Sequence, residues 1–210
     1  MTVFHPNKNS AAAGRVARIA CLISWAALST YAQAAGPVIV LIGAPGSGRA
    51  TQAAALKSER GMAAIFADDL IANNPPAFEK AKKSVIPGFD PRLDPAMDGL
   101  VEAALTGVDL SKGVVLAGYP ASKAQGDYLT KLREKLNLPQ PIIINLVVPD
   151  QVVRKRLTKD KVTDIEQQLQ NYHRELDFAR IYFPQADIRD VNGDQKPAKV
   201  TAAIGKLLPK

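Results

Sequence analysis

The sequence predicts an α/β fold of three layers, with a parallel sheet of about five strands and helices on both faces. Short β-branched apolar runs alternate with helix-length segments along residues 37–208, an alternation typical of parallel sheets. The longest apolar run, residues 142–148, is continuous, as in a strand that is buried on both faces. At 210 residues and 47% hydrophobic content, the chain has room for one well-buried domain and is short for two.

The first 34 residues have the pattern of a cleaved export signal. Three basic residues precede an apolar segment, residues 19–31, and Ala32 to Ala34 offers the small residues that a signal peptidase accepts. The apolar segment is too short for a membrane anchor and is more apolar than an organellar transit peptide. We therefore expect a signal peptide over 1–34, a domain over 35–210 without a stable membrane anchor, and a periplasmic or secreted location.

Cleavage after Ala34 would leave 24 basic and 20 acidic residues, a net charge of +4 instead of +7. It would also remove Cys21, the only cysteine, so the mature chain would have no disulfide, thiol nucleophile or cysteine metal ligand. A mildly basic domain without clusters of aromatic and basic residues gives no reason to expect nucleic acid as a partner. We expect the mature chain to be a monomer.

Five strands are expected, at 37–42, 62–66, 114–116, 142–148 and 188–191, with the fourth at or near the centre of the sheet. Helices are expected from near Gly48, from Pro95, from Ser122 as N-cap, over 150–159 and 164–182, and from Pro197. The polar segment 77–93, which contains two prolines and a glycine, is expected to form a small helix and an irregular loop.

The first strand leads into a glycine-rich loop with the layout of a phosphate-binding site. Its glycines let backbone N–H groups point inward, and the helix that starts near Gly48 adds its positive end. A strand-to-helix turn without a ligand is the alternative. The candidate phosphate-binding residues are Gly43, Ala44, Pro45, Gly46, Ser47, Gly48, Arg49, Ala50 and Thr51.

Several blocks of the chain, in order, resemble the adenylate kinase family of nucleoside monophosphate kinases, which are P-loop proteins. The loop that starts at Gly43 is similar to that family's Gly-x-Pro-Gly-x-Gly-Lys-Gly-Thr-Gln, and Gly118-Tyr119-Pro120 to its Asp-Gly-Phe-Pro-Arg segment. The remaining blocks are Gln125, Val148-Pro149-Asp150, Arg156-Leu157, Tyr172-His173, Val191-Asn192-Gly193 and Lys196-Pro197.

The resemblance implies transfer of a phosphoryl group from ATP with Mg2+ to a nucleoside monophosphate such as AMP. It also implies roles for four residues besides the loop. Gln125 matches a glutamine that contacts the acceptor base, Arg156 an arginine that stacks on the donor base, and Gly193 a backbone contact to that base. Asp68 matches a carboxylate that reaches the metal through water, although an acidic start of a helix explains it equally well. Arg156 is equally explained as a solvated helix charge.

The chain departs from the family pattern mainly in its positive charges. Arg49 stands for the catalytic lysine of the loop, while Ala121, Ile71 and Gln168 stand where the family has arginines. Ala117 replaces the aspartate that organises the water around the metal. The lid loop with its arginines is essentially absent, because Arg156 is followed almost at once by the helix over 164–182.

Phosphoryl transfer depends on positive charge around the moving group, so these losses predict weak or no turnover. Lys159, Lys161 or Arg174 would have to substitute for the missing arginines. Three functions remain open from the sequence: a nucleoside monophosphate kinase of reduced activity, an exported nucleotide-binding module that has lost the reaction, and an interaction domain of the same fold.

Overall fold

The computed structural model describes residues 35–83, 91–93, 95–183 and 188–209. The predicted signal peptide over 1–34 and most of the loop predicted within 77–93 lie outside these ranges. Within the described part of the chain, no helix has the length and apolar character needed to cross a membrane.

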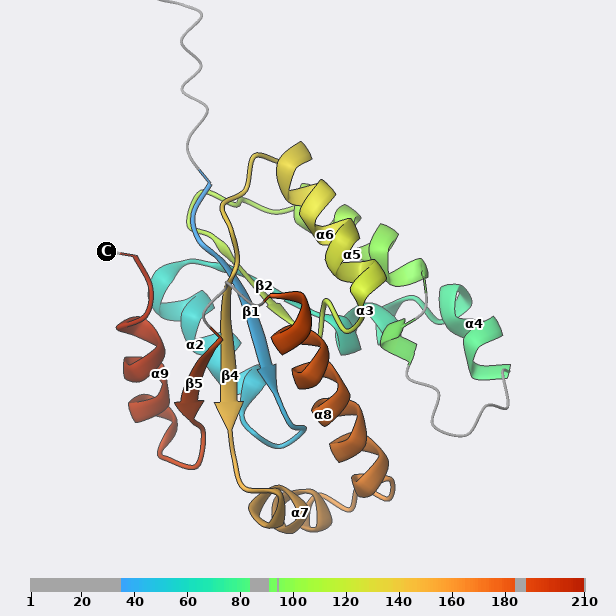
Figure 1. Ribbon diagram of the computed structural model, residues 1–210, viewed down its shortest axis with the longest axis vertical. Helices are drawn as coiled ribbons and strands as arrows, with labels where there is room; N and C mark the ends of the chain where they lie inside the picture. The colour runs from blue at the N-terminus through green and yellow to red at the C-terminus, as the bar shows by residue number, and fades with distance from the viewer. Residues whose placement is uncertain (1–34, 84–90, 94, 184–187, 210) are drawn as a thin grey trace, which may run out of the picture. The chain divides into compact units, whose positions relative to one another are not determined.

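Five parallel strands form the sheet, in the order β2-β3-β1-β4-β5 (Figure 1). Val38 of β1 lies opposite Val114 of β3, and Ile39 lies opposite Ile142 of β4. The predicted five-stranded parallel sheet is therefore confirmed, and β4 neighbours the central strand β1. The strands are β1 (Val38–Gly43), β2 (Ala63–Phe66), β3 (Val114–Ala117), β4 (Ile142–Val147) and β5 (Arg189–Asn192).

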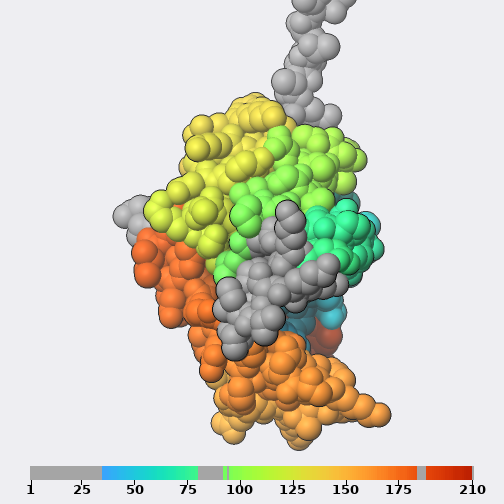
Figure 2. Space-filling view, turned by 90° about the vertical axis from the view of Figure 1, so that its right-hand side faces the viewer, coloured from blue at the N-terminus to red at the C-terminus, as the bar shows by residue number. Residues whose placement is uncertain are grey.

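The helices lie in two layers, one on each face of the sheet (Figure 1). One layer consists of α2 (Arg49–Arg60) and α9 (Pro197–Gly205). The other consists of α3 (Ala67–Asn73), α4 (Pro75–Lys83), α5 (Ala96–Thr106), α6 (Lys123–Lys135), α7 (Asp150–Lys159) and α8 (Ile165–Tyr182), with the 3-10 helix η1 (Pro91–Leu93). Figure 2 shows the surface of this second layer, with α5 and α6 at the top and α7 at the bottom.

Alternating side chains of the central strand divide the core in two. Ile39 and Leu41 face α2 and α9, whereas Val38, Val40 and Ile42 face the larger helical layer. Because both faces are covered, β1 is buried along its whole length, as its continuous apolar sequence predicts.

Chain connections bring the site together at the carboxyl ends of the strands, where ligands bind in open parallel sheets. The loop after β1, the start of α3 after β2 and the turn after β3 all lie at this edge. The connection between α7 and α8 is residues 160–164, which agrees with the predicted absence of a lid.

Candidate functional site

A cavity of about 710 Å³ lies against the loop between β1 and α2. Gly46 and Gly48 have φ values of 74° and 100°, a left-handed conformation that costs glycine little. The N–H of Ser47 donates to the carbonyl of Ala44 at 2.9 Å, which closes the turn. The loop therefore curves around the cavity, as a phosphate-binding loop does.

The structure brings almost all the predicted loop residues to this cavity. They are Gly43, Ala44, Pro45, Gly46, Gly48, Arg49, Ala50 and Thr51. Ser47 is the exception, because its side chain is only 3% exposed and is turned inward. A Cβ at Gly43 would lie 2.6 Å from Ser47 Oγ, so glycine is needed there for Ser47 to pack under the loop.

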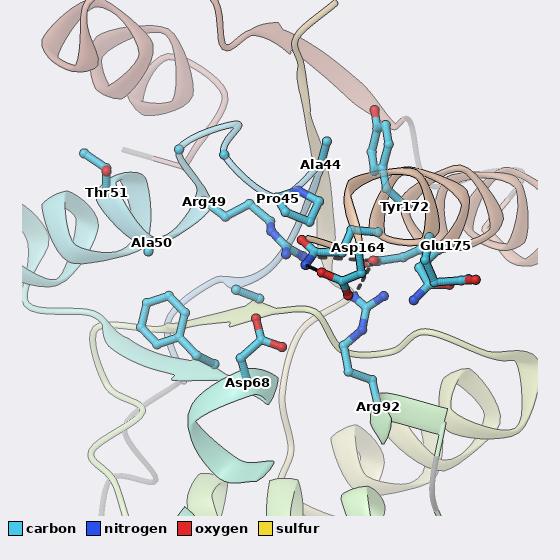
Figure 3. Close-up of a pocket in the computed structure, with 18 residues that line it drawn as sticks. Ala44, Pro45, Arg49, Ala50, Thr51, Asp68, Arg92, Asp164, Tyr172 and Glu175 are labelled. Carbon is cyan, nitrogen blue, oxygen red and sulfur yellow. Dashed lines mark hydrogen bonds and ion pairs between the residues drawn. The ribbon is translucent and has the colours of Figure 1, made fainter. Parts of the chain in front are cut away.

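Arg49, the first residue of α2, extends its side chain into the cavity towards the buried carboxylate of Glu175 on α8 (Figure 3). Arg49 Nη1 lies 4.0 Å from Glu175 Oε2, an ion pair without a hydrogen bond. The same carboxylate oxygen accepts a hydrogen bond from Arg92 Nη1 at 2.7 Å. Two guanidinium groups thus approach one carboxylate, which is 3% exposed.

Arg92 of η1 is held beside the turn that follows β3. A Cβ at Gly118 would lie 3.5 Å from Arg92 Cδ and 3.6 Å from its Nη1, so the arginine crosses directly over this glycine. Gln125 fixes the backbone at the same place. Its Nε2 donates to the carbonyl of Arg92, and its Oε1 accepts from the N–H of Ala121 at 2.8 Å.

Gln125 is the residue predicted to contact an acceptor base. It is buried, and its side-chain amide bonds to two segments of the protein, at Arg92 and at Ala121. It does not line the cavity. Instead, it ties η1 to the turn at Gly118-Tyr119-Pro120, and so positions Arg92.

Tyr119 in this turn is buried and bonds to α5. Its hydroxyl donates to Asp98 Oδ1 at 2.7 Å. Burial raises the pKa of Tyr119, and the hydrogen bond to Asp98 raises it further. Burial also raises the pKa of Asp98, and the bond from Tyr119 opposes this shift. The tyrosine therefore stays a neutral donor, and its role is to hold the turn.

Arg156 on α7 contacts the loop from outside. Its Nη1 donates to the carbonyl of Gly46 at 2.9 Å, and its Nη2 donates to Asp194 Oδ1 at 2.7 Å. Gly193 lies on the same side, where a Cβ would come within 3.2 Å of the Ser47 carbonyl oxygen. Neither residue lines the cavity. Together they brace the back of the loop against the segment after β5.

Two oxygen-bearing side chains suited to Mg2+ line the cavity from different elements. Asp68, in the first turn of α3, and Thr51 of α2 both line it. Among the described residues, no three His, Cys, Asp or Glu side chains gather where they could hold a metal ion. The arrangement fits Mg2+ that arrives with a phosphate and keeps most of its water.

Two residues of the site, Arg92 and Glu175, were not predicted from the sequence. Arg92 lies in a segment without periodicity, which gave no signal. Glu175 did carry one, because it is three residues from Tyr172 and four from Ala179, on the buried stripe of α8. A carboxylate at a buried helix position indicates a charged partner.

Comparison with known proteins places the chain in a family. The family model for adenylate kinase matches residues 41–186. The adenylate kinase of Stenotrophomonas maltophilia (strain R551-3) is 30% identical over 186 residues, which is 79% of this chain and 98% of that protein. The adenylate kinase of Thermodesulfovibrio yellowstonii is 35% identical over 124 residues, 57% of each chain.

The matched region contains the glycine-rich loop, the turn at Gly118-Tyr119-Pro120 and both members of the Arg92–Glu175 pair. The resemblance inferred from motifs, the fold and the comparisons agree. This chain belongs to the adenylate kinase family.

Proposed function

We propose that the protein is a nucleoside monophosphate kinase that transfers a phosphoryl group from ATP with Mg2+ to an AMP-like acceptor, at a reduced rate. One observation carries the proposal. A single cavity is lined both by the loop that follows β1 and by residues of β3, η1 and α3. A donor phosphate on the loop and an acceptor phosphate beside Arg92 would meet in this cavity.

The residues of the chain would act mainly by holding the phosphates. Loop N–H groups and the start of α2 would bind the donor phosphates, while Arg49 supplies a positive charge. The bound Mg2+ would neutralise charge on the transferring group, with Asp68 contacting its water. Arg92 would hold the acceptor phosphate. In the family pattern this role belongs to an arginine at the position that Ala121 occupies here.

The rate is expected to be low for a physical reason. Among the described residues that line the cavity, two are positive, Arg49 and Arg92, and three are negative, Asp68, Asp164 and Glu175. Transition-state charge on a transferring phosphoryl group needs excess positive charge, and one well-placed arginine can change the rate by on the order of 10³-fold or more.

The test is whether the purified protein forms ADP from ATP and AMP in the presence of Mg2+, with ADP measured by chromatography. Contaminating host kinase is the main hazard, so the Gly46→Val variant, prepared identically, is the control. ADP formation by the wild type well above that of the variant supports the proposal. Equal rates in the two preparations contradict it.

A second candidate, a nucleotide-binding module without turnover, is favoured by the ion pair between Arg49 and Glu175, because this pair engages the cation of the loop. Nucleotide binding in a calorimetric titration, together with no ADP formation in the assay above, would select it. The interaction-domain alternative predicts no nucleotide binding at all.

We also propose that the protein is exported to the periplasm or secreted, on the basis of the signal-like residues 1–34. The test is fractionation of cells that express the full chain, with mass measurement of the N-terminus. A mature chain that starts at Ala35 in the exported fraction is expected, and an intact N-terminus in the cytoplasmic fraction contradicts the proposal.

A further inference from the structure

The carboxylate of Glu175 stands where an anionic ligand of the loop would be recognised. It projects from α8 into the cavity, and Figure 3 shows Arg49 and Arg92 reaching towards it from different sides. Guanidinium groups bind carboxylate and phosphate oxygens in the same way. An incoming phosphate would therefore seek the same donors that Glu175 already occupies.

The two arginines are not held equally. Arg92 is hydrogen-bonded to Glu175 at 2.7 Å, whereas Arg49 lies 4.0 Å from the same oxygen. Arg92 is also fixed through its carbonyl by Gln125. The looser partner is the arginine that belongs to the phosphate-binding loop, so Arg49 can leave Glu175 while the Arg92 pair stays intact.

Glu175 also adds negative charge to the cavity directly beside Arg49, 4.0 Å from its guanidinium group. Among the described residues that line the cavity, two are positive and three are negative, and Glu175 is the negative one that pairs with both arginines. A free polyphosphate is therefore repelled more strongly than one whose charge is partly neutralised by Mg2+. This repulsion acts over a short distance in a partly desolvated site, where salt screens it little.

We propose that Glu175 is a specificity-determining residue that competes with bound phosphate for Arg49 and makes the site prefer Mg2+-complexed polyphosphate over the free form. The inference rests on the proposed nucleotide site. Binding of phosphate exchanges one anionic partner of Arg49 for another, so the affinity measured is the difference between the two interactions.

The experiment is calorimetric titration of the purified protein with inorganic tripolyphosphate and with ATP, each with and without Mg2+. Glu175→Gln keeps the shape of the side chain and removes its charge. We expect it to bind free tripolyphosphate about tenfold tighter than the wild type, the scale of a close charge pair. The ratio of the affinities with and without Mg2+ should fall by the same factor.

Asp164→Asn is the matched control. Asp164 lines the same cavity and carries the same charge, but its side chain is exposed and accepts from Gln168 Nε2 at 2.8 Å. If competition for Arg49 is the cause, this variant should change the affinity by less than about threefold. Equal gains in the two variants would show a general charge effect and overturn the inference.

Loss of the Glu175 charge leaves two arginines close together, and their repulsion could prevent Glu175→Gln from folding. A second comparison covers that case. The double variant Arg92→Gln/Glu175→Gln should bind free tripolyphosphate tighter than Arg92→Gln alone. If the wild type binds tripolyphosphate and neither comparison shows tighter binding when Glu175 is replaced, this inference is overturned and the proposed function stands. Absence of binding in wild type and variants would overturn the proposed function, and this inference with it.

Discussion

The two ends of the candidate nucleotide site are built in different ways. At the proposed donor end, the loop after β1 is shaped by its backbone: Gly46 and Gly48 have positive φ, and Arg156 holds the carbonyl of Gly46 from behind. At the proposed acceptor end, the turn after β3 is shaped by side chains. Tyr119 bonds to Asp98, and Gln125 and Glu175 hold Arg92.

This difference shows which part of a phosphate site tolerates sequence change. A loop that binds through N–H groups keeps its function as long as its glycines allow the curvature. An end that binds through charged side chains changes when any one of them is replaced. Here Ala121 offers no charge, and Arg92 from another segment lies against the same turn, paired with an internal carboxylate.

The largest effect is expected from Gly46→Val at the donor end. Valine is strained at φ 74°, and its Cβ would lie 3.3 Å from Leu157 Cδ2. Stability should fall by about 2 kcal/mol, and ATP affinity by about a hundredfold, as measured by melting and calorimetry.

Gly61→Val is the control for this variant, because Gly61 ends the same helix with φ 69°. It should lose similar stability and keep its ATP affinity. If Gly61→Val weakened ATP binding as much as Gly46→Val, the loop would not be the binding element.

Arg92→Gln tests the acceptor end. Removal of one partner from a buried pair leaves Glu175 with Arg49 at 4.0 Å, so we expect the free energy of unfolding to fall by about 3 kcal/mol. Arg154→Gln is the comparison, since Arg154 pairs with Glu166 at 2.7 Å but the two side chains are 44% and 67% exposed. That loss should be about 0.5 kcal/mol. If urea unfolding gave similar losses of stability for the two variants, burial would not be what makes the Arg92 pair more important.

Tyr119→Phe removes the hydroxyl that donates to Asp98 and should lower the free energy of unfolding by about 1.5 kcal/mol. The cost should depend on pH. Burial raises the pKa of Asp98 in the folded protein, so the stability from its protonated form is lost as pH rises through that pKa. Without the Tyr119 hydroxyl the pKa rises further, so the deficit of the variant should be larger at pH 7 than at pH 4. A pH-independent deficit in melting temperature would exclude this coupling.

Arg156→Lys should have the smallest effect and separates two roles for this residue. If Arg156 braces the loop, affinities for ATP and tripolyphosphate should fall together, by about threefold. If it stacks on the donor base, as the resemblance implies, only ATP affinity should fall. Parallel titrations with the two ligands distinguish these outcomes.

Most of the fold could be predicted from the sequence because its signals are local. The run over 142–148 has the composition of a strand covered on both faces, and Ser122 accepts from the N–H of Gln125 as the expected N-cap. The loop that starts at Gly43 was also recognisable, since glycine spacing reports backbone conformation directly.

Side-chain partners in the site could not be predicted in the same way. Arg156 bonds to residues 110 and 38 positions away, and Arg92 to one 83 positions away. No local pattern carries that information. The motif supplied a role for Gln125, but its two hydrogen bonds within the protein depend on where η1 lies relative to the turn.

The central claim is that one cavity holds both nucleotides, and the most direct measurement is titration with a dinucleotide that joins ATP and AMP through their phosphates. We predict that one dinucleotide binds per chain, more tightly than ATP or AMP alone, and that binding is lost in Gly46→Val and kept in Gly61→Val. Absence of binding, or binding that Gly46→Val leaves unchanged, would contradict the claim.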